Sequence, residues 1–299
     1  MDGRQTNPSR LRCKVPNGAG KSTTVRILTT LAKPDAGTAA VAGHDVEREA
    51  ALVRRSIGYV AQQSGADRDA TGRENLTLQG RVHGLSGTAL RRRVDELLAS
   101  LGIADAADRL VRTYSGGMRR RLDITLGLVH RPSVLFLDEP TTGLDPAARA
   151  AMWVELERLA AEESLTVLLT THYLEEADRL ANRLAVVRGG KVVVEGTPEA
   201  LKRELRGDSV TVELADGRAG DAEAAVRALA EVHEAVVDGP VLRARVEHGG
   251  TAVPGILSTL ESRGIPVATV TVARPSLDDV YLHVTGRDFR TEDEEGGNE

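Results

Sequence analysis

The chain has few of the residues that scaffold small secreted proteins or stack on nucleic-acid bases. It contains 1 cysteine in 299 residues, which excludes an internal disulfide and a cysteine-built metal cluster. Only 2% of its residues are aromatic and the formal net charge is -5, so general binding to nucleic acid is not expected. No apolar run reaches the roughly 20 residues that cross a bilayer, and the polar segment 1–14 lacks the apolar centre of a secretory signal. These absences predict a globular protein of the cytoplasm.

Apolar runs of strand length alternate with amphipathic helices from residue 23 to about residue 198, which is typical of a mixed α/β domain. We expect strands at 57–60, 134–137, 166–170, 184–187 and 191–194, with a two-glycine turn joining the last two into a hairpin. We expect helices to begin at Lys21, Ala89, Gly116, Ala147 and Leu174, and a short one to follow the cap formed by Thr197 and Pro198.

The rhythm changes after residue 207 to strand, helix, strand, strand, helix, strand, which is compatible with a small ferredoxin-like domain. A short helix over 277–284 would follow it, and the acidic residues 287–299 read as a disordered tail. We therefore divide the chain into a nucleotide-binding domain over 1–206, an accessory α+β domain over 207–286, and the tail.

A glycine-rich segment holds most of a phosphate-binding loop: Asn17, Gly18, Ala19, Gly20, Lys21, Ser22 and Thr23. Its backbone N–H groups and the following helix N-terminus suit phosphate oxygens, with Lys21 reaching the β and γ phosphates and the Ser22 hydroxyl binding magnesium. The alternative is a glycine turn that caps a helix. Val15 stands where the full pattern has glycine, and the polar segment 8–14 encodes the expected preceding strand only weakly.

Two further segments offer chemistry. Asp138 and Glu139 end an apolar strand, where ligands of α/β sheets bind, so Asp138 would hold magnesium and Glu139 would polarise the attacking water. The alternative is a solvated acidic turn. Ser115, Gly116 and Gly117 precede an amphipathic helix and offer an anion free N–H groups and a hydroxyl, or form an ordinary helix cap with a glycine hinge.

Together these motifs resemble the nucleotide-binding subunit of an ATP-binding cassette (ABC) transporter. Six motifs carry the resemblance in the family's order: Walker A without its first glycine at 17–23, the Q-loop at Gln62, the signature at 115–117, Walker B at Asp138 and Glu139, the D-loop at 143–145, and the switch histidine at His172. Residues 114–123 and 274–282 are similar to daunorubicin-resistance-type drug export ATPases, and the likeness spans Pro16 to Gly286.

The resemblance implies a P-loop NTPase fold with a helical subdomain over about 75–129, and ATP and Mg²⁺ as cofactors. It implies a homodimer in which Ser115, Gly116 and Gly117 contact the γ-phosphate held by the partner, while Asp145 couples the two sites. Gln62 would sense magnesium and water, and His172 would hold the γ-phosphate. A separately encoded permease would hold the chain at the cytoplasmic face of the membrane for export of drugs or antibiotics.

Ordinary alternatives stay open for single residues: Gln62 as a surface amide, Asp145 as a turn residue, His172 as a hydrogen-bonded histidine. The arginine runs 91–93 and 119–121 are expected to be solvated faces. No aromatic residue precedes Pro16, so the family's adenine-stacking residue and first strands are expected to be missing. A second function therefore stays open, a regulatory cassette with impaired nucleotide binding and no turnover.

Overall fold

The computed structural model describes residues 11–14, 20–205, 207–215 and 219–285. The fold consists of two compact units, Met1–Glu195 and Gly196–Glu299, whereas the change of sequence rhythm placed the boundary between residues 206 and 207. Within the described residues, no helix combines the length and the apolar character that a membrane span requires. The tail 287–299 and the loop residues 15–19 lie outside the described part.

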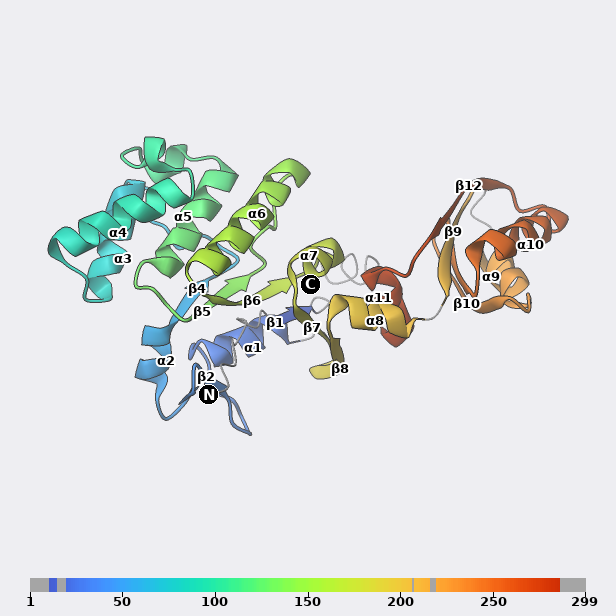
Figure 1. Ribbon diagram of the computed structural model, residues 1–299, viewed down its shortest axis with the longest axis horizontal. Helices are drawn as coiled ribbons and strands as arrows, with labels where there is room; N and C mark the ends of the chain where they lie inside the picture. The colour runs from blue at the N-terminus through green and yellow to red at the C-terminus, as the bar shows by residue number, and fades with distance from the viewer. Residues whose placement is uncertain (1–10, 15–19, 206, 216–218, 286–299) are drawn as a thin grey trace, which may run out of the picture. The chain divides into compact units, whose positions relative to one another are not determined.

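The first unit is built on a six-stranded sheet with the order β4-β5-β6-β1-β7-β8 (Figure 1). Neighbours from β4 to β7 run parallel, and the strands span β1 Leu11–Lys14, β4 Ile57–Val60, β5 Val134–Asp138, β6 Thr166–Thr171, β7 Arg183–Arg188 and β8 Lys191–Gly196. The strands expected from apolar runs are thus confirmed, and the carboxyl ends of the parallel strands share one edge of the sheet. A two-stranded sheet of β2 Ala40–Val41 and β3 His44–Asp45 completes the strands of this unit among the described residues.

Strand β1 forms in the structure although its polar sequence predicts a strand only weakly. It lies between β6 and β7, with Arg12 level with Leu169 on one side and Leu184 on the other. Parallel neighbours on both sides supply backbone hydrogen bonds whatever the side chains are, so a polar segment is recruited into the middle of the sheet.

The five helices of the first unit whose starts were predicted begin within two residues of the expected positions, whereas α2 and α3 were not predicted. The helices are α1 Lys21–Leu28, α2 Ala50–Ser56, α3 Gly72–Val82, α4 Gly87–Ser100, α5 Gly116–Leu128, α6 Pro146–Glu162 and α7 Leu174–Leu180, with 3₁₀ turns at Ala104–Ala106 and Val111–Thr113. Thr71 and Glu74 form a capping box at the N-terminus of α3. Helices α3, α4 and α5 pack together in a group beyond β4 (Figure 1). A separate apolar cluster that includes Leu76, Leu98 and Leu122 stabilises this helical group.

The second unit contains the expected βαββαβ order. Its elements are β9 Asp208–Leu214, α9 Ala219–Arg227, β10 Val232–Asp238, β11 Val241–Val246, α10 Gly249–Ser262 and β12 Val267–Ala273, flanked by α8 Pro198–Glu204 and α11 Leu277–Thr285. The four strands form an antiparallel sheet in the order β10-β11-β9-β12, which confirms the ferredoxin-like prediction. Alternate strand residues such as Val210, Leu242 and Val246 are buried in one core with α9 and α10.

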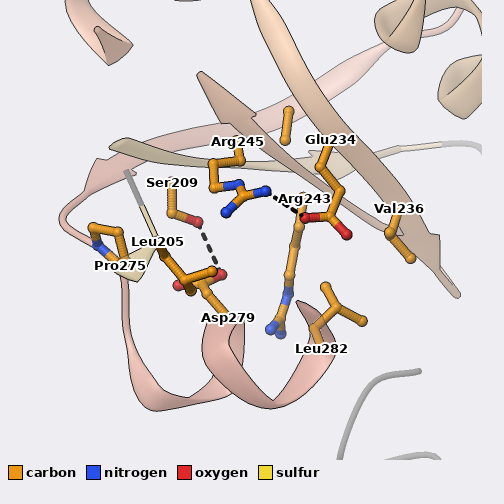
Figure 2. A pocket seen from close by; sticks show the side chains of 10 residues that line it. Leu205, Ser209, Glu234, Val236, Arg243, Arg245, Pro275, Asp279 and Leu282 are labelled. Atoms are coloured by element: carbon orange, nitrogen blue, oxygen red, sulfur yellow. Dashed lines mark hydrogen bonds and ion pairs between the residues drawn. The ribbon is translucent and has the colours of Figure 1, made fainter. Parts of the chain in front are cut away.

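Helix α11 is tied to this sheet by polar contacts (Figure 2). The Ser209 hydroxyl donates to Asp279 at 3.0 Å, and Glu234 accepts from Arg245 at 3.0 Å and lies 3.2 Å from His283 of α11. These contacts fix the C-terminal helix to its own domain.

Candidate functional site

The site forms where β5 and β6 end side by side. Asp138 is the last residue of β5 and is level with Thr170 of β6. The Thr170 hydroxyl donates to Asp138 Oδ1 at 2.5 Å, and the hydroxyl oxygen accepts from the backbone N–H of Glu139 at 3.1 Å. Thr170 therefore orients both acidic residues. Sequence reasoning missed it, although its position at the end of the neighbouring parallel strand was a usable signal.

The Glu139 carboxylate is the meeting point of distant segments. Its Oε2 atom accepts from Gln62 Nε2 at 3.1 Å and from the Thr142 hydroxyl at 3.3 Å, and His172 Nδ1 lies 3.4 Å away. The Glu139 side chain is 11% exposed and that of His172 21%. The structure thus brings together Gln62, Glu139 and His172, the three residues to which the family resemblance gives roles in ATP hydrolysis.

Backbone geometry singles out Glu139 as well. Its φ is 47°, the left-handed region that a non-glycine residue rarely adopts. Such a conformation costs about 1–2 kcal/mol for an L-residue, and here the N–H of Glu139 is held by Thr170 on the next strand. Strain of this kind concentrates at functional sites, where it directs a side chain.

Arg120 of α5 ties the site together from behind. Only 7% of this residue is exposed, and its guanidinium donates to the carbonyl oxygens of Pro140 at 2.7 Å, Asp138 at 3.1 Å and Ala61 at 2.6 Å. These carbonyls flank Glu139 on both sides and precede Gln62 directly. Burial lowers the pKa of Arg120, and the carboxylates of Asp123 and Asp138 act in the opposite direction, which helps to keep the charge.

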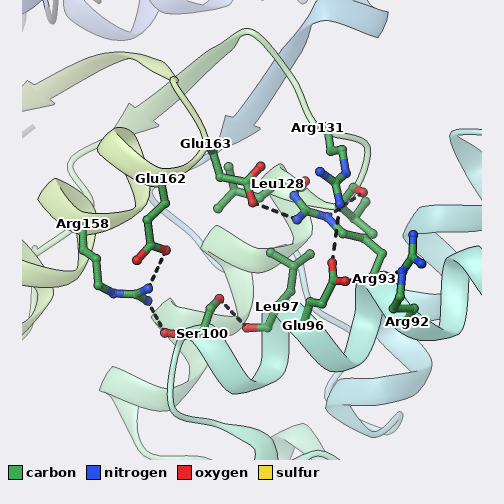
Figure 3. Close-up of polar contacts among 11 residues, drawn as sticks. Arg92, Arg93, Glu96, Leu97, Ser100, Leu128, Arg131, Arg158, Glu162 and Glu163 are labelled. Atoms are coloured by element: carbon green, nitrogen blue, oxygen red, sulfur yellow. Dashed lines mark hydrogen bonds and ion pairs between the residues drawn. The ribbon is translucent and has the colours of Figure 1, made fainter.

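The expectation of solvated arginine runs was wrong at Arg120 and at Arg93. Arg93 is 6% exposed, donates to Leu128 O at 2.8 Å and pairs with Glu163 at 2.8 Å (Figure 3). Each guanidinium is buried because it pairs with carbonyl groups that lie far away in sequence. Arg92, by contrast, has a 75% exposed side chain, as a solvated face requires.

Part of the phosphate-binding loop falls within the described residues. Gly20 has a φ of 101° and precedes α1, a conformation that only glycine adopts without strain. Ser22 and Thr23 are exposed at the start of α1. Asn17, Gly18, Ala19 and the side chain of Lys21 lie outside the described residues.

The remaining motif residues cap helices. Ser115 accepts from Met118 N–H at 3.2 Å at the start of α5, and Asp145 accepts from Ala148 N–H at 2.9 Å at the start of α6. A Cβ added at Gly116 or Gly117 would meet no other described atom within 4 Å, so the start of α5 is open. The capping role found here is compatible with anion binding at the same N-terminus.

The donor set at the end of β5 fits magnesium bound together with a nucleotide. Mg²⁺ takes hard oxygen ligands, and Asp138, a residue only 7% exposed, supplies a carboxylate, with the Ser22 hydroxyl expected beside it. Among the described residues, no group of three or more His, Cys, Asp or Glu residues forms a metal cage. A lone carboxylate and a hydroxyl suit an ion whose other ligands are phosphate oxygens.

Comparison with known proteins shows the family to which the chain belongs. The family model for ABC transporters matches residues 16–142, and the model for the C-terminal domain of DrrA1-3-like ATP-binding proteins matches residues 196–285. The daunorubicin resistance ATP-binding protein DrrA3 of Streptomyces coeruleorubidus is 48% identical over 93% of this chain and 87% of its own length. The daunorubicin/doxorubicin resistance ATP-binding protein DrrA of Streptomyces peucetius is 45% identical over 91% of this chain and 82% of its own length.

Solved structures give the same assignment. An ATP-binding cassette solved as a dimer in a post-hydrolysis state, with ADP and phosphate bound, has a TM-score of 0.58 and 27% identity over 64% of this chain and 86% of that chain. Fold and site thus define a P-loop ATPase of the cassette class. The chain belongs to the ABC transporter family, among its DrrA-like ATP-binding proteins. It is an ATP-binding and ATP-hydrolysing subunit, and cassettes of this family act as dimers with a membrane permease.

Proposed function

We propose that Glu139 is the general base that activates water for attack on the γ-phosphate of ATP. The observation that carries this proposal is the convergence of Gln62, Thr142 and His172 on one Glu139 oxygen. A carboxylate at the end of a parallel strand, held in a strained backbone conformation, is positioned to accept a proton from water. Gln62 senses and orients that water, and His172 contacts the γ-phosphate.

Asp138 and the Ser22 hydroxyl would hold Mg²⁺, with Gln62 as a further oxygen ligand. The bound ion would offset negative charge on the phosphate oxygens as the water attacks. The backbone of 17–20 would cradle the phosphates, with Lys21 as a mobile cation and Ser22 and Thr23 at the helix N-terminus.

The active assembly in our proposal is a homodimer with two nucleotides between the copies. The open start of α5 supports this arrangement, because Ser115, Gly116 and Gly117 can approach a phosphate held by the second copy. Asp145, at the exposed start of α6, would couple the two sites across the interface.

We further propose that the chain works at the cytoplasmic face of the membrane, bound to a separately encoded permease. Its relatives include a daunorubicin resistance ATP-binding protein and a Nod factor export ATP-binding protein. The identities of 48% and 45% to resistance proteins favour export of drugs or antibiotics over other cargo.

The test is phosphate release from magnesium ATP by the full chain, with nucleotide binding measured separately by equilibrium dialysis. Glu139→Gln should lower the rate at least about 100-fold, since a positioned base contributes roughly 10²–10⁴, and should leave ATP binding within threefold. The matched control is Glu162→Gln, the same substitution at the exposed end of α6, which should keep the rate. An unchanged rate in Glu139→Gln would refute the role of this base, and no release from the natural chain would favour a cassette without turnover.

A further inference from the structure

Helix α6 lies between the D-loop and the segment that begins at the switch histidine. Asp145 of the D-loop caps the start of α6. Arg149 and Trp153 are four positions apart, so they lie on the same face of this helix. Both contact residues 172–176, which we call the switch segment. One face of α6 therefore connects the two motifs within a single chain.

The Arg149 guanidinium contacts both motifs at once. Its central carbon lies over the ring of Tyr173, 3.6 Å from the ring centroid. A guanidinium at this distance is attracted to the face of the ring, and more strongly where water is excluded. The Nη2 atom donates to the carbonyl oxygen of Leu144 in the D-loop at 3.4 Å, while Nε is shielded from solvent and has no hydrogen-bond partner among the described residues. The Tyr173 ring is thus the closest partner that holds this guanidinium.

Tyr173 connects Arg149 to His172. The centroids of the Tyr173 and His172 rings lie 4.0 Å apart, and the rings are tilted by 44°. His172 Nδ1 lies 3.4 Å from Glu139 Oε2. Among the described residues, the His172 ring makes no other polar or ring contact. The direction of the His172 ring therefore depends on where the Tyr173 ring is held.

Other contacts hold the backbone of the switch segment but not the Tyr173 ring. The Tyr173 N–H donates to the Thr171 hydroxyl at 3.0 Å, whereas its side chain makes no cap for α7. The buried Glu176 carboxylate accepts from Trp153 Nε1 at 2.9 Å, which fixes α7 to α6. These contacts would survive the loss of Arg149, so the specific contribution of Arg149 is the position of the Tyr173 ring.

We propose that Arg149 is a positioning residue for ATP hydrolysis, which holds His172 beside Glu139 through the Tyr173 ring and ties this arrangement to the D-loop. The inference rests on the proposed function, in which His172 contacts the γ-phosphate. A change at the D-loop would reach His172 through successive contacts of Leu144 with Arg149, of Arg149 with Tyr173, and of Tyr173 with His172.

The first test measures phosphate release from magnesium ATP by the full chain, with the Kd for ATP taken from equilibrium dialysis and the folded fraction from circular dichroism. Arg149→Gln should lower kcat per folded molecule at least about tenfold, because a displacement of about 1 Å can lower a rate about 100-fold. The Kd should change less than about threefold. Tyr173→Leu should act in the same way, whereas Tyr173→Phe keeps the ring and should keep kcat close to that of the natural chain.

Arg179→Gln is the matched control. Arg179 is an exposed residue of α7, and its guanidinium lies over the Trp153 ring at 5.6 Å from the centroid. The control thus removes the same kind of contact between the same two helices, away from His172, and should leave kcat unchanged. An unchanged kcat in Arg149→Gln, or an equal loss in Arg149→Gln and Arg179→Gln, would overturn the positioning role.

A double substitution separates positioning from a merely structural effect. In a His172→Ala background, Arg149→Gln should slow single-turnover phosphate release less than about twofold further, because Arg149 acts through His172. A further loss as large as in the natural background would overturn the proposal. A His172→Ala chain that keeps the natural rate would refute the proposed contact of His172 with the γ-phosphate, and the role of Arg149 in hydrolysis with it.

A readout without turnover observes the His172 ring itself. The chain contains 7 histidines, so the ring signals of a histidine-labelled chain can be separated by NMR and His172 assigned by its loss in His172→Gln. Arg149→Gln should move the His172 signal, and Arg179→Gln should not. Asp145→Ala removes the cap of α6 and should move the signal in the natural background but not in Arg149→Gln.

This measurement decides the proposal even for a chain that releases no phosphate. A His172 signal that stays in place in Arg149→Gln would overturn the contact through Tyr173. Equal shifts caused by Asp145→Ala in both backgrounds would overturn the link to the D-loop.

Discussion

The contacts of Arg120 lead to a sharp prediction for the substitution Arg120→Lys. The change keeps a positive charge but replaces a planar fork with one point donor, so it cannot reach Ala61, Asp138 and Pro140 together. Hydrogen bonds to charged groups contribute about 1.5–3 kcal/mol each, and neighbouring ones are not additive. Losing one or two of them should lower the free energy of unfolding by about 2–4 kcal/mol.

The effect on catalysis should exceed the effect on binding. The lost bonds anchor the backbone on both sides of Glu139 and directly before Gln62, and a shift of about 1 Å in a catalytic group can lower a rate about 100-fold. We therefore expect kcat for ATP hydrolysis to fall about 10- to 100-fold, while the Kd for ATP changes less than threefold. Both are measured below the unfolding transition, with the folded fraction taken from circular dichroism.

Arg121→Lys is the matched control, because Arg121 is the next residue of α5 and is only partly buried. It should leave kcat unchanged. If Arg120→Lys lost stability but kept kcat per folded molecule, Arg120 would stabilise the fold without positioning Glu139.

Three further substitutions test packing and titration. Arg93→Ala should lower the free energy of unfolding by about 1–3 kcal/mol in urea titrations with ATP binding retained, because Glu163 and the carbonyl oxygen of Leu128 each lose a charged donor, although Arg131 N–H still donates to that carbonyl. Gly58→Ala should lower the free energy of unfolding by more than about 3 kcal/mol, because the added Cβ would lie 2.1 Å from Gly127 O. Gly65→Ala is the control and should change the free energy of unfolding little, because its Cβ would have no other described atom within 4 Å. Burial lowers the pKa of His130 to about 4, whereas an unfolded histidine titrates near 6.5. As the pH drops from about 6.5 towards 4, the unfolded chain therefore binds this proton before the folded chain does, and the free energy of unfolding falls. His130→Gln should reduce that loss by about 2 kcal/mol between pH 7 and pH 4, allowing for the partly exposed ring.

The strands of the six-stranded sheet were predictable because parallel strands that are buried on both faces consist of uninterrupted runs of apolar residues. Residues 134–137 are such a run, and the two carboxylates after it are placed by the end of the strand itself. The same holds for helix caps such as Thr197, whose hydroxyl accepts from Ala200 N–H at 3.1 Å. Local chemistry decides these features, so local sequence reveals them.

Contacts between distant segments were not predictable in the same way. Arg120 and Arg121 are adjacent and chemically identical, yet only the first is buried, because the carbonyls that accept from it come from the ends of β4 and β5. Likewise, β12 reads as an ordinary strand, and only the strand order shows that it lies at an edge. Burial and edge position are properties of topology, which a pattern of single residues does not encode.

The Gln62–Glu139 contact lies between these two cases. The two residues are 77 positions apart, and neither has a local signal that demands the other. Two features of the fold bring them together. Strands β4 and β5 pair in parallel with Val60 level with Leu137, so the residues just past each strand lie at the same edge of the sheet. Arg120 then donates to backbone carbonyls at the ends of both strands. The positive φ of Glu139 directs its side chain towards Gln62 and His172 and not along the strand. The geometry of the proposed catalytic site is therefore a consequence of strand register, secured by the buried Arg120 of α5.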